Sequence, residues 1–247
     1  MRFRHADALR SDFPELSAGA LCAEVGTARD AGSAAGLAMR VAAYTARATA
    51  RLDRAPESEF PEVRAWRRAF ARMGLKPTQY RCASEALLRR LRKDGSLPRI
   101  HPVVDVCNAI SAAYGIPVAV LDAERIAGPL LVVRRARGDE PYVSFGGGTE
   151  HPAPGEVIFA DSAGRAHARR WTNRQSAHSA VCGRTRRVIV VAEALHDGGA
   201  DAVADLLTTV AHELAAHWRT VPEPAILTPA APECVLTTPS ASGTTAP

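Results

Sequence analysis

Hydrogen-bond donors and one tryptophan are concentrated in the stretch ARRWTNRQSAHS, residues 168–179, which follows a segment typical of a core strand. Guanidinium groups bind carbonyl, carboxylate and phosphate oxygens, and an indole ring can stack on a nucleobase. Two interpretations follow: a solvated turn, or a binding site for a polyanion or another polar ligand. The side chains concerned are Arg169, Arg170, Trp171, Asn173, Arg174, Gln175 and His178.

A second polar pair lies in the segment LPRIHPVVDVCNAIS, residues 97–111. On a helix that begins near Val103, Asp105 and Asn108 are three residues apart and share one face. Asparagine has a poor propensity for the middle of a helix, so its amide is expected to have a use. It could tie down a neighbouring loop or contact a ligand, and the sequence leaves both open.

The motifs that could hold a metal ion or a nucleotide phosphate have the wrong spacing. In HELAAH, His212 and His217 are five residues apart, roughly 140° around a helix, so they should diverge instead of sharing a zinc ion. FGGGTE, residues 145–150, lacks the Lys-Ser/Thr ending of a phosphate loop and is expected to be a glycine turn. The five cysteines lie far apart. We therefore expect no metal and no cofactor.

The order of the predicted elements indicates an α+β protein, with N-terminal helices first and mixed short strands after them. Apolar residues at helical spacing predict helices, and short apolar runs bounded by Gly, Pro or Asp predict strands. Ser84 is expected to cap the third helix and Gly95 to end it. The expected segments are a strand at 16–25, helices at 27–54, 61–73, 84–95, 103–115 and 199–218, and strands between 116 and 195.

Composition separates the C-terminal segment from the rest of this 247-residue chain. Residues 221–247 are rich in Pro, Thr, Ser and Ala and contain no Lys or Arg, which predicts a disordered tail after a single domain at 1–220. The formal net charge of +5 permits an anionic partner, and all basic residues except Lys76 and Lys93 are arginines. There is no apolar run of signal-peptide or membrane-spanning length, so a cytoplasmic protein without a membrane partner is expected.

Four segments in the same order resemble the B3/B4 tRNA-binding and editing domain of the phenylalanyl-tRNA synthetase beta subunit. In DVCNAISAAYGIPVAVLD, residues 105–122, the motif Asp-Val-x-Asn, the Gly-x-Pro stretch and the closing Asp122 match at the same spacing. VVRRARGDE (132–140) and GEVIFADSAG (155–164) are similar to two later strands with their turns. SEALLRRLRKDGSLPRIHPVVD (84–105) is similar to the opening of free-standing members of this family. The resemblance spans roughly residues 80–194.

This resemblance implies an α+β fold with a β-sandwich, an editing pocket between its layers and an aminoacyl-tRNA ligand. In the synthetase the domain hydrolyses tyrosine wrongly attached to phenylalanine tRNA. Two family residues are absent: Ala119 stands where the synthetase has a histidine, and its Gly-Gly-Glu turn aligns with RRWTNRQSAHS. Trp171, Asn173, Arg174 and Gln175 are therefore expected to line the equivalent pocket with a different chemistry.

Hydrolysis of an aminoacyl ester needs a positioned water molecule and stabilisation of the developing oxyanion. Arg174 could donate to the carbonyl or the terminal phosphate, and Gln175 or Asn108 could orient water; these three are the candidate catalytic residues. Trp171 could stack on the terminal adenine or be a core aromatic. The candidate substrate-binding residues are Asp105, Trp171, Asn173 and Arg134.

Exposed arginines are the candidates for contact with tRNA phosphates, although surface charges on strands could equally block edge association. They are Arg135, Arg184, Arg186 and Arg187. The sequence thus favours a trans-acting aminoacyl-tRNA deacylase rather than a whole synthetase. The alternatives are a non-catalytic tRNA- or RNA-binding module and, more distantly, a small-molecule pocket. No DNA partner is expected.

Overall fold

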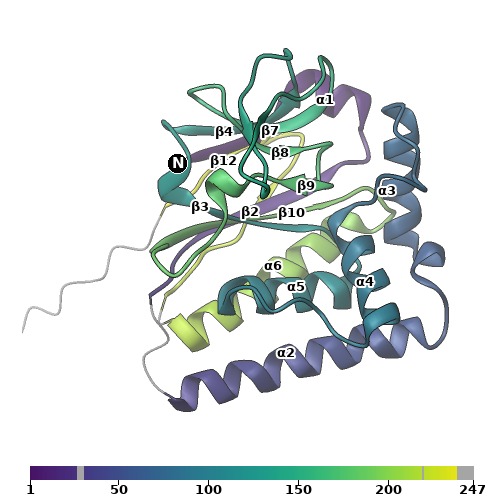
Figure 1. Cartoon of the computed structure of the whole chain (residues 1–247), viewed down its shortest axis with the longest axis vertical. Coiled ribbons are helices and arrows are strands. Elements are labelled where there is room, and N and C mark those ends of the chain that lie inside the picture. Colours follow the sequence, from purple (N-terminus) through teal and green to yellow (C-terminus); the bar gives the residue numbers. More distant parts are fainter. Residues whose placement is uncertain (27–30, 219, 238–247) are drawn as a thin grey trace, which may run out of the picture.

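The computed structural model of the chain describes residues 1–26, 31–218 and 220–237. In these residues the elements form two large β-sheets, a small two-stranded sheet and a layer of helices (Figure 1). The helices are α1 (Asp7–Asp12), α2 (Ala31–Leu52), α3 (Pro61–Arg72), α4 (Ala83–Asp94), α5 (Pro102–Tyr114) and α6 (Gly199–Trp218). The strands are β1 (Arg2–His5), β2 (Ser17–Glu24), β3 (Val118–Asp122), β4 (Leu130–Arg135), β5 (Tyr142–Val143), β6 (Thr149–Glu150), β7 (Val157–Asp161), β8 (Ala166–Arg169), β9 (Arg174–Gln175), β10 (Arg187–Ala194), β11 (Ala225–Leu227) and β12 (Glu233–Val235).

The two larger sheets pack face to face as a sandwich. One has six strands in the order β12-β1-β4-β7-β8-β9, and the other has four in the order β11-β2-β10-β3. Only the β1–β4 pair is parallel among the strand pairs of these sheets in the described residues. Side chains from both sheets, including Phe3, Phe159, Leu121 and Val191, meet in one buried cluster. The expected α+β class and the β-sandwich are confirmed.

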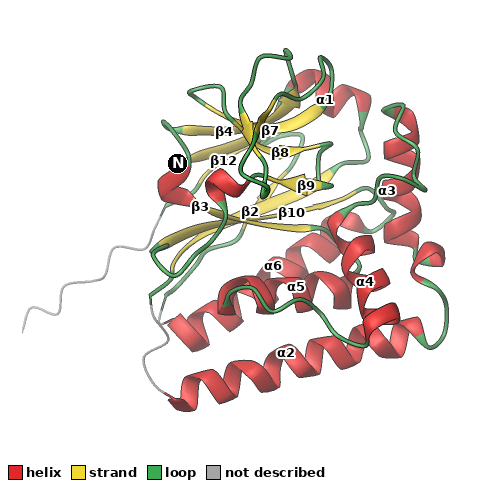
Figure 2. Ribbon diagram, viewed as in Figure 1, coloured by secondary structure: helices red, strands yellow, loops and turns green. Residues whose placement is uncertain are grey.

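The helical layer covers the other face of the four-stranded sheet (Figure 2). Because β10 is buried on both faces, its residues alternate between the sandwich core and the helix-facing core: Ile189 and Val191 belong to the first, Val188 and Val190 to the second. Leu88 and Leu91 of α4 and Val106 and Ile110 of α5 pack into the helix-facing core. This packing fixes α4 and α5 beside the strands that carry the polar residues.

Local sequence signals located most helix ends, with one error. Gly95 and Gly115 end α4 and α5 in the left-handed conformation, with φ of +69° and +73°, where glycine has no steric penalty. The expectation that Ser84 caps α4 was wrong. The helix begins one residue earlier, Cys82 is its N-cap residue without a side-chain cap, and the buried Ser84 hydroxyl lies 3.4 Å from the Cys82 Sγ.

The expected disorder of the C-terminal segment is wrong for residues 221–237. Strand β11 adds to the edge of β2, and β12 adds to the edge of β1. A strand added at a sheet edge gains its hydrogen bonds from the neighbouring backbone, and so it needs few apolar side chains of its own; here Leu227 and Leu236 are buried. Residues 238–247 lie outside the described residues, as do residues 27–30 of the first predicted helix. We therefore propose one domain that reaches at least residue 237.

Candidate functional site

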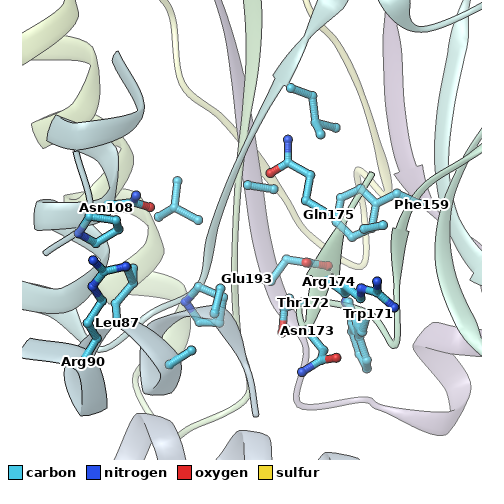
Figure 3. Close-up of a pocket in the computed structure, with 18 residues that line it drawn as sticks. Leu87, Arg90, Asn108, Phe159, Trp171, Thr172, Asn173, Arg174, Gln175 and Glu193 are labelled. Carbon is cyan, nitrogen blue, oxygen red and sulfur yellow. Dashed lines mark hydrogen bonds between the residues drawn. The ribbon is translucent and has the colours of Figure 1, made fainter. Parts of the chain in front are cut away.

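A cavity of about 350 Å³ lies where α4 and α5 meet the ends of the strands. Figure 3 shows Leu87, Arg90 and Asn108 on its helical side and Phe159, Trp171, Arg174 and Gln175 on the strand side. Apolar residues form much of the wall. The polar residues that line it are Arg90, Asn108, Thr172, Asn173, Arg174, Gln175 and Glu193.

Five residues selected from the sequence converge on this cavity, although they come from two distant parts of the chain. Asn108 lies on α5, whereas Trp171, Asn173, Arg174 and Gln175 lie on the β8–β9 turn and on β9. The stretch ARRWTNRQSAHS is therefore not simply a solvated turn, because its central part forms one wall of a cavity.

The β8–β9 turn places two bulky residues in the left-handed region. Arg170 has φ of +46° and Trp171 has φ of +59°, a conformation that costs roughly 1–3 kcal/mol for such residues. Two hydrogen bonds from backbone N–H groups hold it in place: Trp171 N donates to the Val157 carbonyl oxygen at 2.7 Å, and Arg170 N donates to the side-chain Oε1 of Glu156 at 3.0 Å. The turn directs the Trp171 ring back into the sandwich.

Trp171 is a core residue that also forms part of the cavity wall. Its side chain is 0% exposed and packs edge-to-face against Trp66 and Phe13, with ring centroids 4.9 and 5.0 Å apart. A ring with no exposed surface is not free to stack on a nucleobase, so the core interpretation holds for this structure. Asn173 also has a positioning contact, because its Nδ2 donates to the Arg81 carbonyl oxygen at 2.7 Å and joins the turn to the start of α4.

Glu193 is the functional candidate that sequence reasoning missed. It is only 2% exposed, and its Oε1 accepts hydrogen bonds from His5 Nε2 at 2.6 Å and Trp171 Nε1 at 2.8 Å. Both of these hydrogen bonds use Oε1, and Oε2 forms no hydrogen bond with another described residue. Burial lowers the pKa of the neighbouring Arg10, and the Glu193 charge opposes this shift. A lone glutamate in the apolar strand VIVVAEAL was the available signal.

The three candidate catalytic residues differ in whether their polar groups already form hydrogen bonds or ion pairs within the protein. Asn108 is half-buried and makes no side-chain hydrogen bond to any described residue. Its amide therefore does not hold a neighbouring loop in place, which was one of the two alternatives from the sequence. Gln175 donates from Nε2 to the Val120 oxygen at 2.9 Å, which commits one end of its amide. Arg174 is 44% exposed and lies 3.3 Å from Glu150. Of the three, Asn108 is the least committed.

Asp105 and Arg134, two of the expected substrate-binding residues, do not line this cavity. Asp105 accepts from the backbone N–H groups of Ile100 and His101 at 2.7 and 3.2 Å, and so it anchors the loop before α5. Arg134 donates to Glu140. Burial acts to raise the pKa of Glu140, but hydrogen bonds from backbone N–H groups and from Arg134 outweigh it and hold the pKa at about 2.

The arginines expected to contact RNA lie away from the cavity. Arg135 forms an ion pair with Asp12. Arg184, Arg186 and Arg187 are exposed, but they precede or begin β10, whose far end carries Glu193. Glu193 lies six positions after Arg187 along the strand, which corresponds to roughly 20 Å. An RNA end bound in the cavity would need other basic residues close to it.

The structure also bears on HELAAH, on FGGGTE and on the length of the helices. His212 is exposed and His217 Nε2 lies 3.7 Å from Glu213, a buried carboxylate that also accepts from Arg40 and Tyr44. FGGGTE forms the turn between β5 and β6, as predicted, with Ser144 N donating to the Gly148 oxygen. None of the helices in the described ranges is long and apolar enough to cross a membrane.

Comparison with known proteins agrees with the resemblance in the sequence. A curated relative, the phenylalanine–tRNA ligase beta subunit of Carboxydothermus hydrogenoformans, is 36% identical over 75 residues, which are 30% of this chain and 9% of that subunit. A solved N-terminal fragment of the phenylalanyl-tRNA synthetase beta subunit from Pyrococcus horikoshii is 9% identical, with a TM-score of 0.46, over 90% of this chain and 49% of the fragment. The chain thus spans a small part of the curated relative. The B3/4 domain model matches residues 65–204, more than half of the chain, and the protein therefore belongs to the B3/4 domain family.

Proposed function

We propose that this protein binds tRNA and hydrolyses the ester bond of an aminoacyl-tRNA in the cavity between α4, α5 and β9. Membership of the B3/4 domain family and the similarity to a tRNA ligase subunit support a tRNA-related function. The observation that carries the hydrolytic part is that two polar groups lining one cavity form no hydrogen bond with another described residue: the Asn108 amide and Glu193 Oε2.

Such groups suit the chemistry of ester hydrolysis. The oxygen of a water molecule attacks the ester carbonyl carbon, the carbonyl oxygen becomes an oxyanion, and the ribose oxygen of the tRNA leaves with a proton. Glu193 can accept a hydrogen bond from the attacking water and take its proton, while Asn108 Nδ2 and Arg174 can donate to the oxyanion. In this proposal Glu193 orients the water, a role that the sequence gave to Gln175 or Asn108. The Gln175 amide nitrogen already donates to the Val120 oxygen.

The cavity is also suited to holding the amino-acid part of such an ester. Its volume of about 350 Å³ lies within the range of small-molecule pockets, roughly 300–1,000 Å³. Leu87, Leu121 and Phe159 supply apolar wall for a side chain. The amino acid is thus expected to be buried, with its ester near the polar residues.

A deacylation assay tests the proposal. The full chain is incubated with tRNAs charged with each of several amino acids, and release of the amino acid is followed. We expect hydrolysis of at least one species well above the rate in buffer alone. If every ester survives while tRNA is bound, the protein is a non-catalytic tRNA-binding module, an alternative favoured by Ala119 in place of the family histidine.

A further inference from the structure

A groove of basic side chains lies on α4, next to the cavity, and Arg90 lines both. The groove has a volume of about 480 Å³, and its lining is Arg89, Arg90, Arg92, Lys93 and Asp94. Arg90 is shared by the groove and the cavity. A ligand that lies in the groove can therefore extend into the cavity past one guanidinium group.

The acidic residues near the groove only partly offset its positive charge. Arg89 and Arg92 both bind the buried carboxylate of Glu57, at 3.1 and 3.0 Å, so two guanidinium groups share one negative charge. Arg90 lies 3.8 Å from Asp94 in an exposed pair, a type that contributes at most about 1 kcal/mol. The groove retains a net positive charge.

A second guanidinium group lies across the cavity from Arg90. Arg174, on β9, lines the same cavity and contacts Glu150 through long distances of 3.3 and 3.4 Å. Guanidinium groups of this kind, exposed and loosely paired, can rearrange to bind a phosphate with two hydrogen bonds. The cavity thus has an exposed cation on its helical side and on its strand side.

The chemistry of α4 favours a nucleic-acid backbone over a membrane surface. A helix that lies on a membrane inserts its apolar face, but Leu88 and Leu91 of α4 are buried in the helix-facing core. Its exposed face offers arginines and a lysine at spacings of three and four residues, a row of cations along the helix. A row of cations beside a cavity suits a chain of phosphates that ends in the group held by the cavity.

We propose that the α4 groove binds the single-stranded 3′ end of the RNA, with Arg90 and Lys93 contacting its phosphates where it enters the cavity. This inference rests on the proposed function, because it assumes that the RNA carries the esterified amino acid. It assigns the RNA contact to α4 and not to the arginines that precede and begin β10.

Binding of uncharged tRNA to the full chain tests this assignment. Affinity is measured over a range of salt concentrations for the wild type, for Arg90→Ala with Lys93→Ala, and for Arg186→Ala as an exposed arginine that directly precedes β10. We expect the α4 double variant to bind about tenfold more weakly. Its dependence of log K on log salt should be shallower by about 1.4, since each lost phosphate contact on a single strand removes about 0.7. Arg89 and Arg92 stay intact, because their loss would leave Glu57 buried without a partner.

A tRNA trimmed of its single-stranded 3′ end distinguishes the groove from a more distant contact. For this RNA the wild type and the α4 double variant should bind equally. The inference is overturned if the double variant binds intact tRNA like the wild type, if Arg186→Ala has the larger effect, or if the wild type binds no tRNA. Groove-dependent binding without hydrolysis of any ester leaves this inference standing and removes the deacylase proposal. Hydrolysis of an ester, combined with tRNA binding that the α4 double variant does not change, would overturn this inference and support the deacylase proposal.

Discussion

Asn108 and Asp105 lie three residues apart on α5, but only the Asp105 side chain forms hydrogen bonds with other described residues. Asp105 uses its carboxylate to bind two backbone N–H groups, whereas Asn108 lines the cavity without a hydrogen bond to any described residue. We expect Asn108→Ala to reduce deacylation at least tenfold and to leave the melting temperature unchanged or slightly higher, because alanine has the better helix propensity. Rate and thermal unfolding are measured on the same preparation.

Asp105→Ala is the matched contrast for that experiment. It leaves the N–H groups of Ile100 and His101 without their acceptor, which should lower the free energy of unfolding by about 1–3 kcal/mol. A loss of stability in the Asn108 variant, equal to that of the Asp105 variant, would contradict a ligand-binding role for Asn108.

Glu193 allows a second prediction at the scale of one residue. Glu193→Gln keeps the size of the side chain and an oxygen that can accept from His5 and Trp171, but it removes the negative charge. If the carboxylate takes a proton from water, the rate of deacylation should fall about a hundredfold, while tRNA affinity stays near that of the wild type. Single-turnover hydrolysis and tRNA binding are the measurements. An unchanged rate in a folded variant would remove Glu193 from the mechanism.

Among the elements, the β4–β5 connection gives a pH-dependent prediction. Glu140, with its pKa held at about 2, is ionised in the folded state at pH values where an unfolded-state glutamate, near 4.5, takes up a proton. Its contribution to stability is therefore complete above about pH 4.5 and is lost as the pH falls toward 2. Glu140→Gln should flatten the decrease in stability over this range, as measured by urea unfolding. A slope as steep as that of the wild type would contradict the assignment.

The β8–β9 turn shows how far sequence reasoning reaches at this scale. The accumulation of donors made Asn173, Arg174 and Gln175 candidate site residues, with a solvated turn as the alternative, and all three line the cavity. The direction of the Trp171 ring could not be predicted, since it depends on two residues with positive φ and on contacts to Trp66 and Phe13 from distant elements. Periodicity likewise predicted the helices but not the pairing of β strands, because pairing is set by contacts far apart in the sequence.

For the whole molecule, the order of elements was sufficient to predict an α+β fold, and the family motifs were sufficient to predict a sandwich. Contacts between residues that are far apart in the sequence were not predicted. His5, near the N-terminus, binds Glu193 on β10, and Arg90 on α4 lines the cavity. The disorder predicted from composition was wrong for residues 221–237 for the same reason. The contribution of β11 and β12 comes from the strands they join, which a count of apolar residues does not record.

The C-terminal strands should therefore contribute measurably to the stability of the whole domain. Leu227 and Leu236 are both 4% exposed and belong to the sandwich core, so truncating either to alanine should cost about 2–5 kcal/mol in the free energy of unfolding. Val235, which is 64% exposed and directly precedes Leu236, is the matched control, and Val235→Ala should change stability by less than about 0.5 kcal/mol. The three variants are compared by chemical denaturation. Equal and small effects in all three would mean that residues 221–237 are not held in the core, and the disordered tail expected from composition would be the better description.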